Sequence, residues 1–353
     1  SKSRGNGVDP LKLMEDYGAD GMRFGLLMQV TGAQDLKFNE NKLVSSRNFA
    51  NKIRNAARFV MMNLDDYTPG APYPTTPADR WIFSRLARLV ASIDEAYKEY
   101  EFSDMTRELY AFFWNEFCDW YIELSKPRLA AGGQDRAACQ RNLVFVLDTA
   151  LRLLHPAMPF VTEQIYQDMP GEKDSPYLMM AAWPDAEELA AYIDPAAERA
   201  LAIVTQSVSG IRSIRARYGI SPKTKLEMTV KAQSAEAVQL FEEQQNLIVA
   251  LGNVEVVAVS ETAEKPAEST MRLADDVEIY VALSGLVDFA AEQARIEKEL
   301  GKLEKDRVKF DKKLSNPGFL SKAAPEIIEK DRAKLADIVE RMDRLQAELA
   351  EMK

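Results

Sequence analysis

Alternating steps of four and three residues run through the segment 289–352 and constrain the fold more than any other feature of the sequence. The first series comprises positions 289, 293, 296, 300, 303, 307, 310 and 314, which hold Phe, Gln, Ile, Leu, Leu, Arg, Phe and Leu. After Asn316-Pro317-Gly318 the stepping resumes through Leu335, Ile338, Met342, Leu345, Leu349 and Met352. This is the heptad spacing of coiled coils. The segment therefore predicts a two-helix antiparallel coiled coil, with arms of roughly 40 Å at 1.5 Å per residue.

The first half of the chain is typical of an antiparallel helix bundle with short loops. Asp9-Pro10 predicts the start of a short helix that stops at Gly18, and we expect Asp20 and Asp79 to cap later helices. A long helical pattern places Phe49, Ile53, Ala56, Ala57 and Val60 on one face. Further helices are predicted at about 80–99, 102–124, 141–154 and 160–169.

The composition changes near Asp185 and indicates a small α/β unit. A helix at about 195–217 is followed by the alternating segment 225–231, which is typical of a strand. A helix at 235–251, a strand at 254–259 and two strands near 270 and 277–281 complete the unit. The predicted fold class is therefore mainly α, with a helix bundle, a small α/β unit and the C-terminal coiled coil.

Charge and cysteine content limit the classes of function. The formal net charge is −10, from 45 Lys+Arg against 55 Asp+Glu, so RNA contacts would have to come from local basic patches. Two cysteines and one histidine make a disulfide framework or a zinc site implausible, and we predict no metal site. No stretch reaches the roughly 18 apolar residues of a bilayer span, and no signal peptide opens the chain. We therefore expect no membrane partner and a reduced, cytoplasmic protein.

Several conspicuous side chains have an ordinary structural interpretation. Phe113, Phe117, Trp120 and Tyr121 are spaced for one helix face, and we expect them in the core rather than as platforms for base stacking. His155 lies in the apolar helix end 153–159, where a buried or capping histidine is the usual case.

The first six residues, Ser1-Lys2-Ser3-Arg4-Gly5-Asn6, are small, polar and basic. Such a loop can turn backbone N–H groups toward an anion while a lysine reaches a phosphate, and it can equally be a solvated tail. Together with its continuation to Pro10 and the segment 17–24, this loop resembles the second ATP signature of class I aminoacyl-tRNA synthetases and the residues that follow it. The signature is Lys-Met-Ser-Lys-Ser. Its first two residues are missing here, as expected of a C-terminal fragment.

The resemblance implies roles for the first residues. Lys2 would be catalytic and stabilise the triphosphate of ATP while the aminoacyl-adenylate forms, and Ser1, Lys2 and Ser3 would bind the ATP phosphates. ATP is then a substrate, with Mg²⁺ implied by the family, and neither is expected to be bound by this fragment alone.

Two parts of the bundle carry the resemblance further. The segment 47–53 is similar to the helix that opens the anticodon-binding domain of the valyl, isoleucyl and leucyl enzymes, although Arg54 stands where the family usually has tryptophan. The segments 114–126 and 154–163 resemble the valyl enzymes specifically.

The turn at 314–325 resembles the tip of the tRNA-binding arm of valyl-tRNA synthetases. Six lysines cluster on the helix before it: Lys298, Lys302, Lys305, Lys309, Lys312 and Lys313. They are either a solvated coiled-coil flank or, as the resemblance implies, contacts to phosphates of the tRNA elbow. We predict tRNA contacts for Lys302, Lys305, Lys309, Lys312 and Lys313.

A second basic run, 212–217, holds Arg212, Arg215 and Arg217 within two helical turns. Ordinary solvation explains these arginines, and contact with an RNA backbone is the alternative, based on local charge alone.

The resemblance implies four domains. Residues 1–35 would end the catalytic domain, 36–190 would form the anticodon-binding domain, 191–284 the small α/β unit and 285–353 the coiled-coil arm.

The resemblance implies a valine–tRNA ligase, in which ATP, valine and tRNA(Val) give valyl-tRNA, AMP and diphosphate. We expect the fragment to be monomeric and inactive alone, because most of the catalytic domain and the editing domain would lie upstream. Two alternatives stay open, which are an isoleucyl-tRNA synthetase fragment and a non-catalytic RNA-binding or coiled-coil protein. The isoleucyl enzyme typically ends in a cysteine zinc site, whereas this chain has no C-x-x-C.

Overall fold

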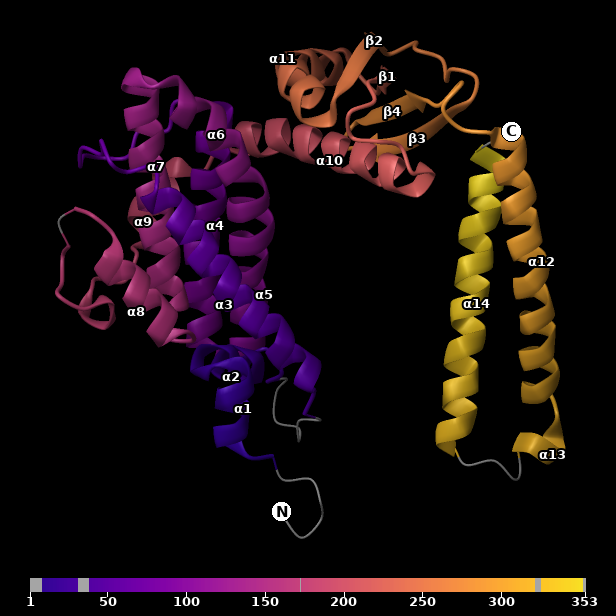
Figure 1. Ribbon diagram of the computed structural model, residues 1–353, viewed down its shortest axis with the longest axis horizontal. Coiled ribbons are helices and arrows are strands. Elements are labelled where there is room, and N and C mark those ends of the chain that lie inside the picture. Colours follow the sequence, from indigo (N-terminus) through magenta and orange to yellow (C-terminus); the bar gives the residue numbers. More distant parts are fainter. Residues whose placement is uncertain (1–7, 31–37, 172, 321–324, 352–353) are drawn as a thin grey trace. The chain divides into compact units, whose positions relative to one another are not determined.

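The computed structural model describes residues 8–30, 38–171, 173–320 and 325–351 (Figure 1). The chain divides into two compact units, Ser1–Leu201 and Ala202–Lys353. None of the helices in the described ranges has the length and apolarity that crossing a bilayer requires.

The first unit is a helix bundle (Figure 1). Its α-helices are α1 Pro10–Tyr17, α2 Ala19–Leu27, α3 Glu40–Met61, α4 Pro77–Lys98, α5 Phe102–Tyr110, α6 Ile122–Ala131, α7 Gly133–Leu154, α8 Pro159–Asp168 and the short α9 Ala186–Leu189. A π-helix, η2, spans Ala111–Tyr121, and two 3₁₀ turns lie at η3 Leu178–Met180 and η4 Ala190–Tyr192. The predicted bundle is confirmed.

The apolar face of α3 packs into the core as the spacing predicts. Phe49, Ile53, Ala57 and Val60 are fully buried. On α2, Gly25 allows a close approach to α3, because a Cβ atom at this position would lie only 2.8 Å from a methyl carbon of Leu43. A larger residue at Gly25 would therefore push the two helices apart.

Two helix caps differ from the sequence-based expectation. Asp79 is not the N-cap of α4. Thr76 is the N-cap, and Asp79 is the third helical residue of a capping box with Thr76. Asp20 does not cap its own helix either. Its carboxylate accepts hydrogen bonds from the backbone N–H groups of Phe160 (3.2 Å) and Val161 (2.6 Å), and so caps α8 from another part of the sequence.

The predicted helix at 102–124 is continuous but not uniform, since the π-helix separates α5 from α6. Phe113, Phe117 and Tyr121 are buried in the core, which confirms three of the four aromatic predictions, whereas Trp120 is half-buried. His155 caps the C-terminus of α7, and its Nδ1 atom lies 2.8 Å from the hydroxyl of Thr162. Burial lowers the pKa of His155, consistent with the expected structural role.

The second unit contains the predicted α/β fold. Helix α10 (Pro195–Tyr218) precedes β1 (Leu226–Ala232), α11 (Ala235–Gly252), β2 (Val254–Ser260), β3 (Ser269–Ala274) and β4 (Val277–Ala282). The sheet order is β2-β1-β4-β3. Strand β1 pairs in parallel with β2 and antiparallel with β4, and β3 pairs antiparallel with β4.

The same unit ends in two long helices, α12 (Phe289–Leu314) and α14 (Pro325–Glu351), with the short α13 (Pro317–Leu320) after the first (Figure 1). Every heptad position whose side chain is described is buried or half-buried, and Ile296 and Leu345 are the most deeply buried. The predicted helical hairpin is confirmed.

Candidate functional site

The predicted ATP-binding residues Ser1, Lys2 and Ser3 lie outside the described residues, which begin at Val8. Their roles stay predictions. The other predicted site residues lie on α10 and α12, and the structure gives them different surroundings.

Arg215 on α10 is a buried structural residue. Its side chain is 7% exposed, and its guanidinium donates to the backbone carbonyls of Ser221 (2.9 Å), Gly252 (3.1 Å) and Asn253 (3.0 Å). These bonds tie the end of α10 to the α11–β2 connection. Arg215 was predicted to contact RNA, but its donors are used inside the unit, so we leave it out of the candidate interface.

The two flanking arginines differ from Arg215. Arg212 is exposed, whereas Arg217 is half-buried, with its guanidinium 4.9 Å from the centroid of the Tyr218 ring. The basic run therefore does not form one continuous patch. Helical geometry turns its middle member toward the core and leaves Arg212 as its most accessible charge.

The lysines of α12 form a single ridge. With Leu300 and Arg307 at heptad position a, Lys302 and Lys309 occupy position c, while Lys298, Lys305 and Lys312 occupy position f, and both positions face away from the partner helix. All five side chains are exposed, and we call them the basic ridge. No ion pair joins any of the five to another described residue.

The outward face of α14 does not repeat this pattern. Its corresponding positions hold Lys330, Ala333, Asp337, Glu340 and Arg344, a mixture of both signs. Only one side of the hairpin therefore presents uniform positive charge.

Lys313, the sixth lysine, lies beside the ridge but serves the hairpin itself. Its ammonium forms an ion pair at 2.6 Å with the nearly buried carboxylate of Asp331 on α14, and it lies 4.7 Å from the centroid of the Phe319 ring. Lys313 was predicted to contact tRNA, but its partners indicate that it holds the two helices and the tip together.

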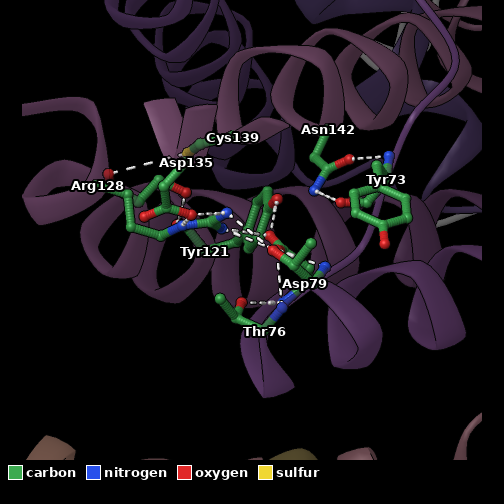
Figure 2. Close-up of polar contacts among 10 residues, drawn as sticks. Tyr73, Thr76, Asp79, Tyr121, Arg128, Asp135, Cys139 and Asn142 are labelled. Carbon is green, nitrogen blue, oxygen red and sulfur yellow. Dashed lines mark hydrogen bonds and ion pairs between the residues drawn. The ribbon is translucent and has the colours of Figure 1, made fainter. Parts of the chain in front are cut away.

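Sequence reasoning missed a buried polar network in the bundle (Figure 2). Its centre is Asp79, whose side chain is fully buried. One carboxylate oxygen accepts from the hydroxyl of Tyr121 at 2.7 Å, and both accept from Nη1 of Arg128 at 2.8 Å. The backbone N–H groups of Thr75 and Thr76 donate to Oδ2 at 3.2 and 3.1 Å.

The network extends to α7. Nε of Arg128 donates to Asp135 at 2.8 Å, and the amide of Asn142 exchanges two hydrogen bonds with the backbone of Tyr73, at 2.7 and 3.0 Å (Figure 2). These two sets of polar contacts together fix the α3–α4 connection against α6 and α7. The sequence signal that could have revealed it is the capping box Thr76-Pro77-Ala78-Asp79.

The electrostatics of the network favour a structural role. Burial acts to raise the pKa of Asp79, but the charge of Arg128 and the hydrogen bonds from Tyr121 and Thr76 outweigh it and hold the pKa below its usual value. Burial and the nearby Asp79 carboxylate raise the pKa of Tyr121 well above 10. Asp79 therefore stays ionised and Tyr121 stays protonated at neutral pH, and both are committed to their partners.

Known families match three stretches of the chain. Residues 1–61 match the family described as tRNA synthetases class I (M), residues 79–230 match the anticodon-binding domain of tRNA ligase, and residues 288–353 match the valyl tRNA synthetase tRNA binding arm. All three families are described as parts of tRNA ligases, the first as class I and the third as valyl.

Curated relatives cover the chain from end to end. A valine–tRNA ligase of Geobacter sulfurreducens is 39% identical over 358 residues, which span 100% of this chain and 40% of the relative. The enzyme of Petrotoga mobilis is 39% identical over 355 residues with the same coverage, and that of Carboxydothermus hydrogenoformans is 40% identical over 95% of this chain and 38% of the relative. Along its whole length the chain is similar to valine–tRNA ligases, and it spans about 40% of the length of these relatives.

Proposed function

We propose that the chain is the tRNA-recognising part of an enzyme that joins valine to tRNA(Val) with ATP, releasing AMP and diphosphate. The 39% identity to a valine–tRNA ligase along the whole of this chain supports the activity. The tRNA part of the proposal is supported by the basic ridge, which lies in a stretch that matches a tRNA-binding arm.

The ridge suits an RNA backbone for a physical reason. Its lysines extend over residues 298–312, or about 21 Å of helix at 1.5 Å per residue, and they are exposed and without ion pairs among the described residues. Lysines that neutralise phosphates release condensed counterions, so binding weakens as salt increases. The mixed charges on the outer face of α14 make that face a poorer partner.

The test compares the double variant Lys305→Gln, Lys309→Gln with the control Lys330→Gln, Lys334→Gln, which removes two exposed positive charges from α14. Binding of a tRNA(Val) transcript would be titrated at several salt concentrations. We expect the α12 variant to bind more weakly and to lower the log–log salt slope by about 1 for each lysine that no longer neutralises a phosphate. Equal effects of the two double variants would contradict the proposed ridge.

Several narrower assignments belong to the same proposal. Lys2 would stabilise the ATP triphosphate, Ser1 and Ser3 would help to bind its phosphates, and Mg²⁺ would accompany ATP. Arg212 is the member of the α10 run best exposed for an RNA contact. We propose a monomeric, cytoplasmic protein with the divisions 1–35, 36–190, 191–284 and 285–353.

A further inference from the structure

A cavity of about 290 Å³ lies against α7, and its described lining does not include Asp79 or the residues that bond to Asp79. Its floor consists of residues spaced three to four apart on α7, from Arg141 through Phe145 and Asp148 to Arg152. The α3–α4 connection supplies Tyr67 on one side, and α8 with the residues after it supplies Tyr166 and Lys173. Two distant segments thus enclose one face of a single helix.

Asp148 has unused capacity to accept hydrogen bonds. Its Oδ2 accepts from Nε of Arg152 at 2.8 Å, and Oδ1 has no donor among the described residues. The other guanidinium nitrogens of Arg152 are occupied by Asp174 and the carbonyl of Ala182. Burial raises the pKa of Asp148 despite the opposing charge of Arg152. A half-buried carboxylate with one free oxygen is a typical recognition group in a pocket.

Two further groups with spare donors adjoin this carboxylate. Nε of Arg141 donates to the carbonyl of Thr68 at 3.1 Å, and its terminal nitrogens have no acceptor among the described residues. The hydroxyl of Tyr67 likewise has no partner in the described part of the chain. Tyr67, Arg141 and Asp148 all line this one cavity, and burial raises the pKa of Tyr67.

Aromatic surfaces surround these polar groups. Tyr67, Phe145 and Tyr166 line the cavity, and the ammonium of Lys173 lies 5.5 Å from the centroid of the Tyr166 ring. Flat apolar walls, an acceptor and two cations together fit a planar heterocycle that carries N–H donors and an anionic group. A divalent metal would need more oxygen ligands than the one carboxylate among the described lining residues.

We propose that this cavity binds a nucleotide whose base carries an exocyclic amino group, with the amino group donating to Asp148 and the phosphate facing Arg141 and Lys173. Carboxylates accept from the N4 amino group of cytosine, and aromatic side chains stack on bases of any sequence. The ligand is either a free mononucleotide or a nucleotide of single-stranded RNA. With single-stranded RNA as the ligand, the inference rests on the proposed function and deepens it, whereas a free mononucleotide goes beyond that function.

The test uses CMP and UMP as a matched pair, since the two bases differ at C4, where cytosine has an amino donor and uracil a carbonyl acceptor. Calorimetric titration of the 353-residue chain should give tighter binding of CMP than of UMP. Asp148→Asn should reduce the CMP to UMP affinity ratio by about tenfold, because a charge-assisted hydrogen bond is replaced. Asp168→Asn, an exposed change on α8, should leave the ratio unchanged.

A second variant tests the phosphate end. Arg141→Gln should weaken CMP and UMP by a similar factor and leave the weaker binding of cytidine, which lacks the phosphate, unaltered. Circular dichroism establishes that each variant is folded. The proposal is overturned if the wild-type chain does not bind CMP at millimolar concentration, or if folded Asp148→Asn keeps the full preference for CMP.

The two sources of ligand are separated with a short oligocytidylate. Tighter binding of the oligonucleotide than of CMP, with both weakened by Asp148→Asn, identifies single-stranded RNA. The reverse order identifies a free nucleotide. Substitutions of the ridge lysines on α12 should leave CMP binding unchanged. A cavity that does not bind nucleotides and a ridge that does not bind tRNA therefore give different results.

Discussion

The hydroxyl of Tyr121 donates a hydrogen bond to Asp79 at 2.7 Å and joins the end of the π-helix to the first turn of α4. Both side chains are almost completely buried. Arg128 supplies the balancing charge from α6. The stability of the bundle should therefore depend on polar contacts that the apolar pattern of the sequence does not reveal.

Removing the Tyr121 hydroxyl should destabilise the bundle. Tyr121→Phe takes one donor from a buried carboxylate, and hydrogen bonds to charged groups contribute about 1.5–3 kcal/mol. Urea unfolding should show a loss in this range. Tyr110→Phe is the matched control at the other end of the π-helix, because its hydroxyl has no partner among the described residues, and it should change the free energy of unfolding little. Equal losses would contradict the assigned role.

Acid should unfold the first unit as its paired carboxylates become protonated. Hydrogen bonds from Arg152 lower the pKa of Asp174 to about 2, and the Arg128 charge and hydrogen bonds outweigh burial to lower that of Asp79. A lowered folded-state pKa stabilises the protein above the unfolded pKa of about 3.9, and this contribution is lost as pH falls through the folded value. Unfolding free energy should decline between about pH 4 and 2. Asp174→Asn should make that decline shallower, and an unchanged pH profile would be inconsistent with the pairing.

Arg215 should affect stability rather than RNA binding. Arg215→Leu removes the guanidinium donor from the buried carbonyl of Gly252, whereas the carbonyls of Ser221 and Asn253 keep the N–H groups of Thr224 and Leu226. An unsatisfied buried group costs about 1–3 kcal/mol. Thermal unfolding of the α/β unit should shift to lower temperature. Lys223→Gln, an exposed change in the turn after α10, should leave the transition in place. A stable Arg215→Leu variant that does not bind tRNA would show instead that Arg215 contacts RNA, as its place in the basic run 212–217 predicts.

The neighbouring lysines Lys312 and Lys313 should have opposite effects. Lys313→Gln removes the partner of Asp331, whose carboxylate is nearly buried while the lysine is 43% exposed. The cost should therefore be less than the ~3–5 kcal/mol of breaking a fully buried pair. The helical hairpin should unfold at a lower temperature. Lys312→Gln should leave hairpin stability unchanged and weaken tRNA binding in a salt-dependent way. Circular dichroism and filter binding on both variants provide the comparison, and identical behaviour of the two would refute the division of roles.

The sequence by itself determined the helices, the strands and the hairpin to a large extent. Heptad steps identified the seam between α12 and α14, and alternation identified β1, because both periodicities are local properties of helices and strands. The same spacing placed Phe49 and Ile53 of α3 in the core. The resemblance to valyl-tRNA synthetases likewise followed from contiguous segments, which need no knowledge of distant contacts.

Only the tertiary structure decided which charged side chains are available to a ligand. Lys312 and Lys313 are adjacent in sequence, but their helical directions differ, so one faces solvent and the other meets Asp331. Arg215 lies three residues from Arg212, yet it points toward carbonyls that come from residues 37 and 38 positions later. The sequence predicts Asp20 and Asp79 as capping residues. The N–H groups that each carboxylate accepts from depend on which helix end packs beside it. Such pairings are set by long-range packing and desolvation, which a local pattern does not contain.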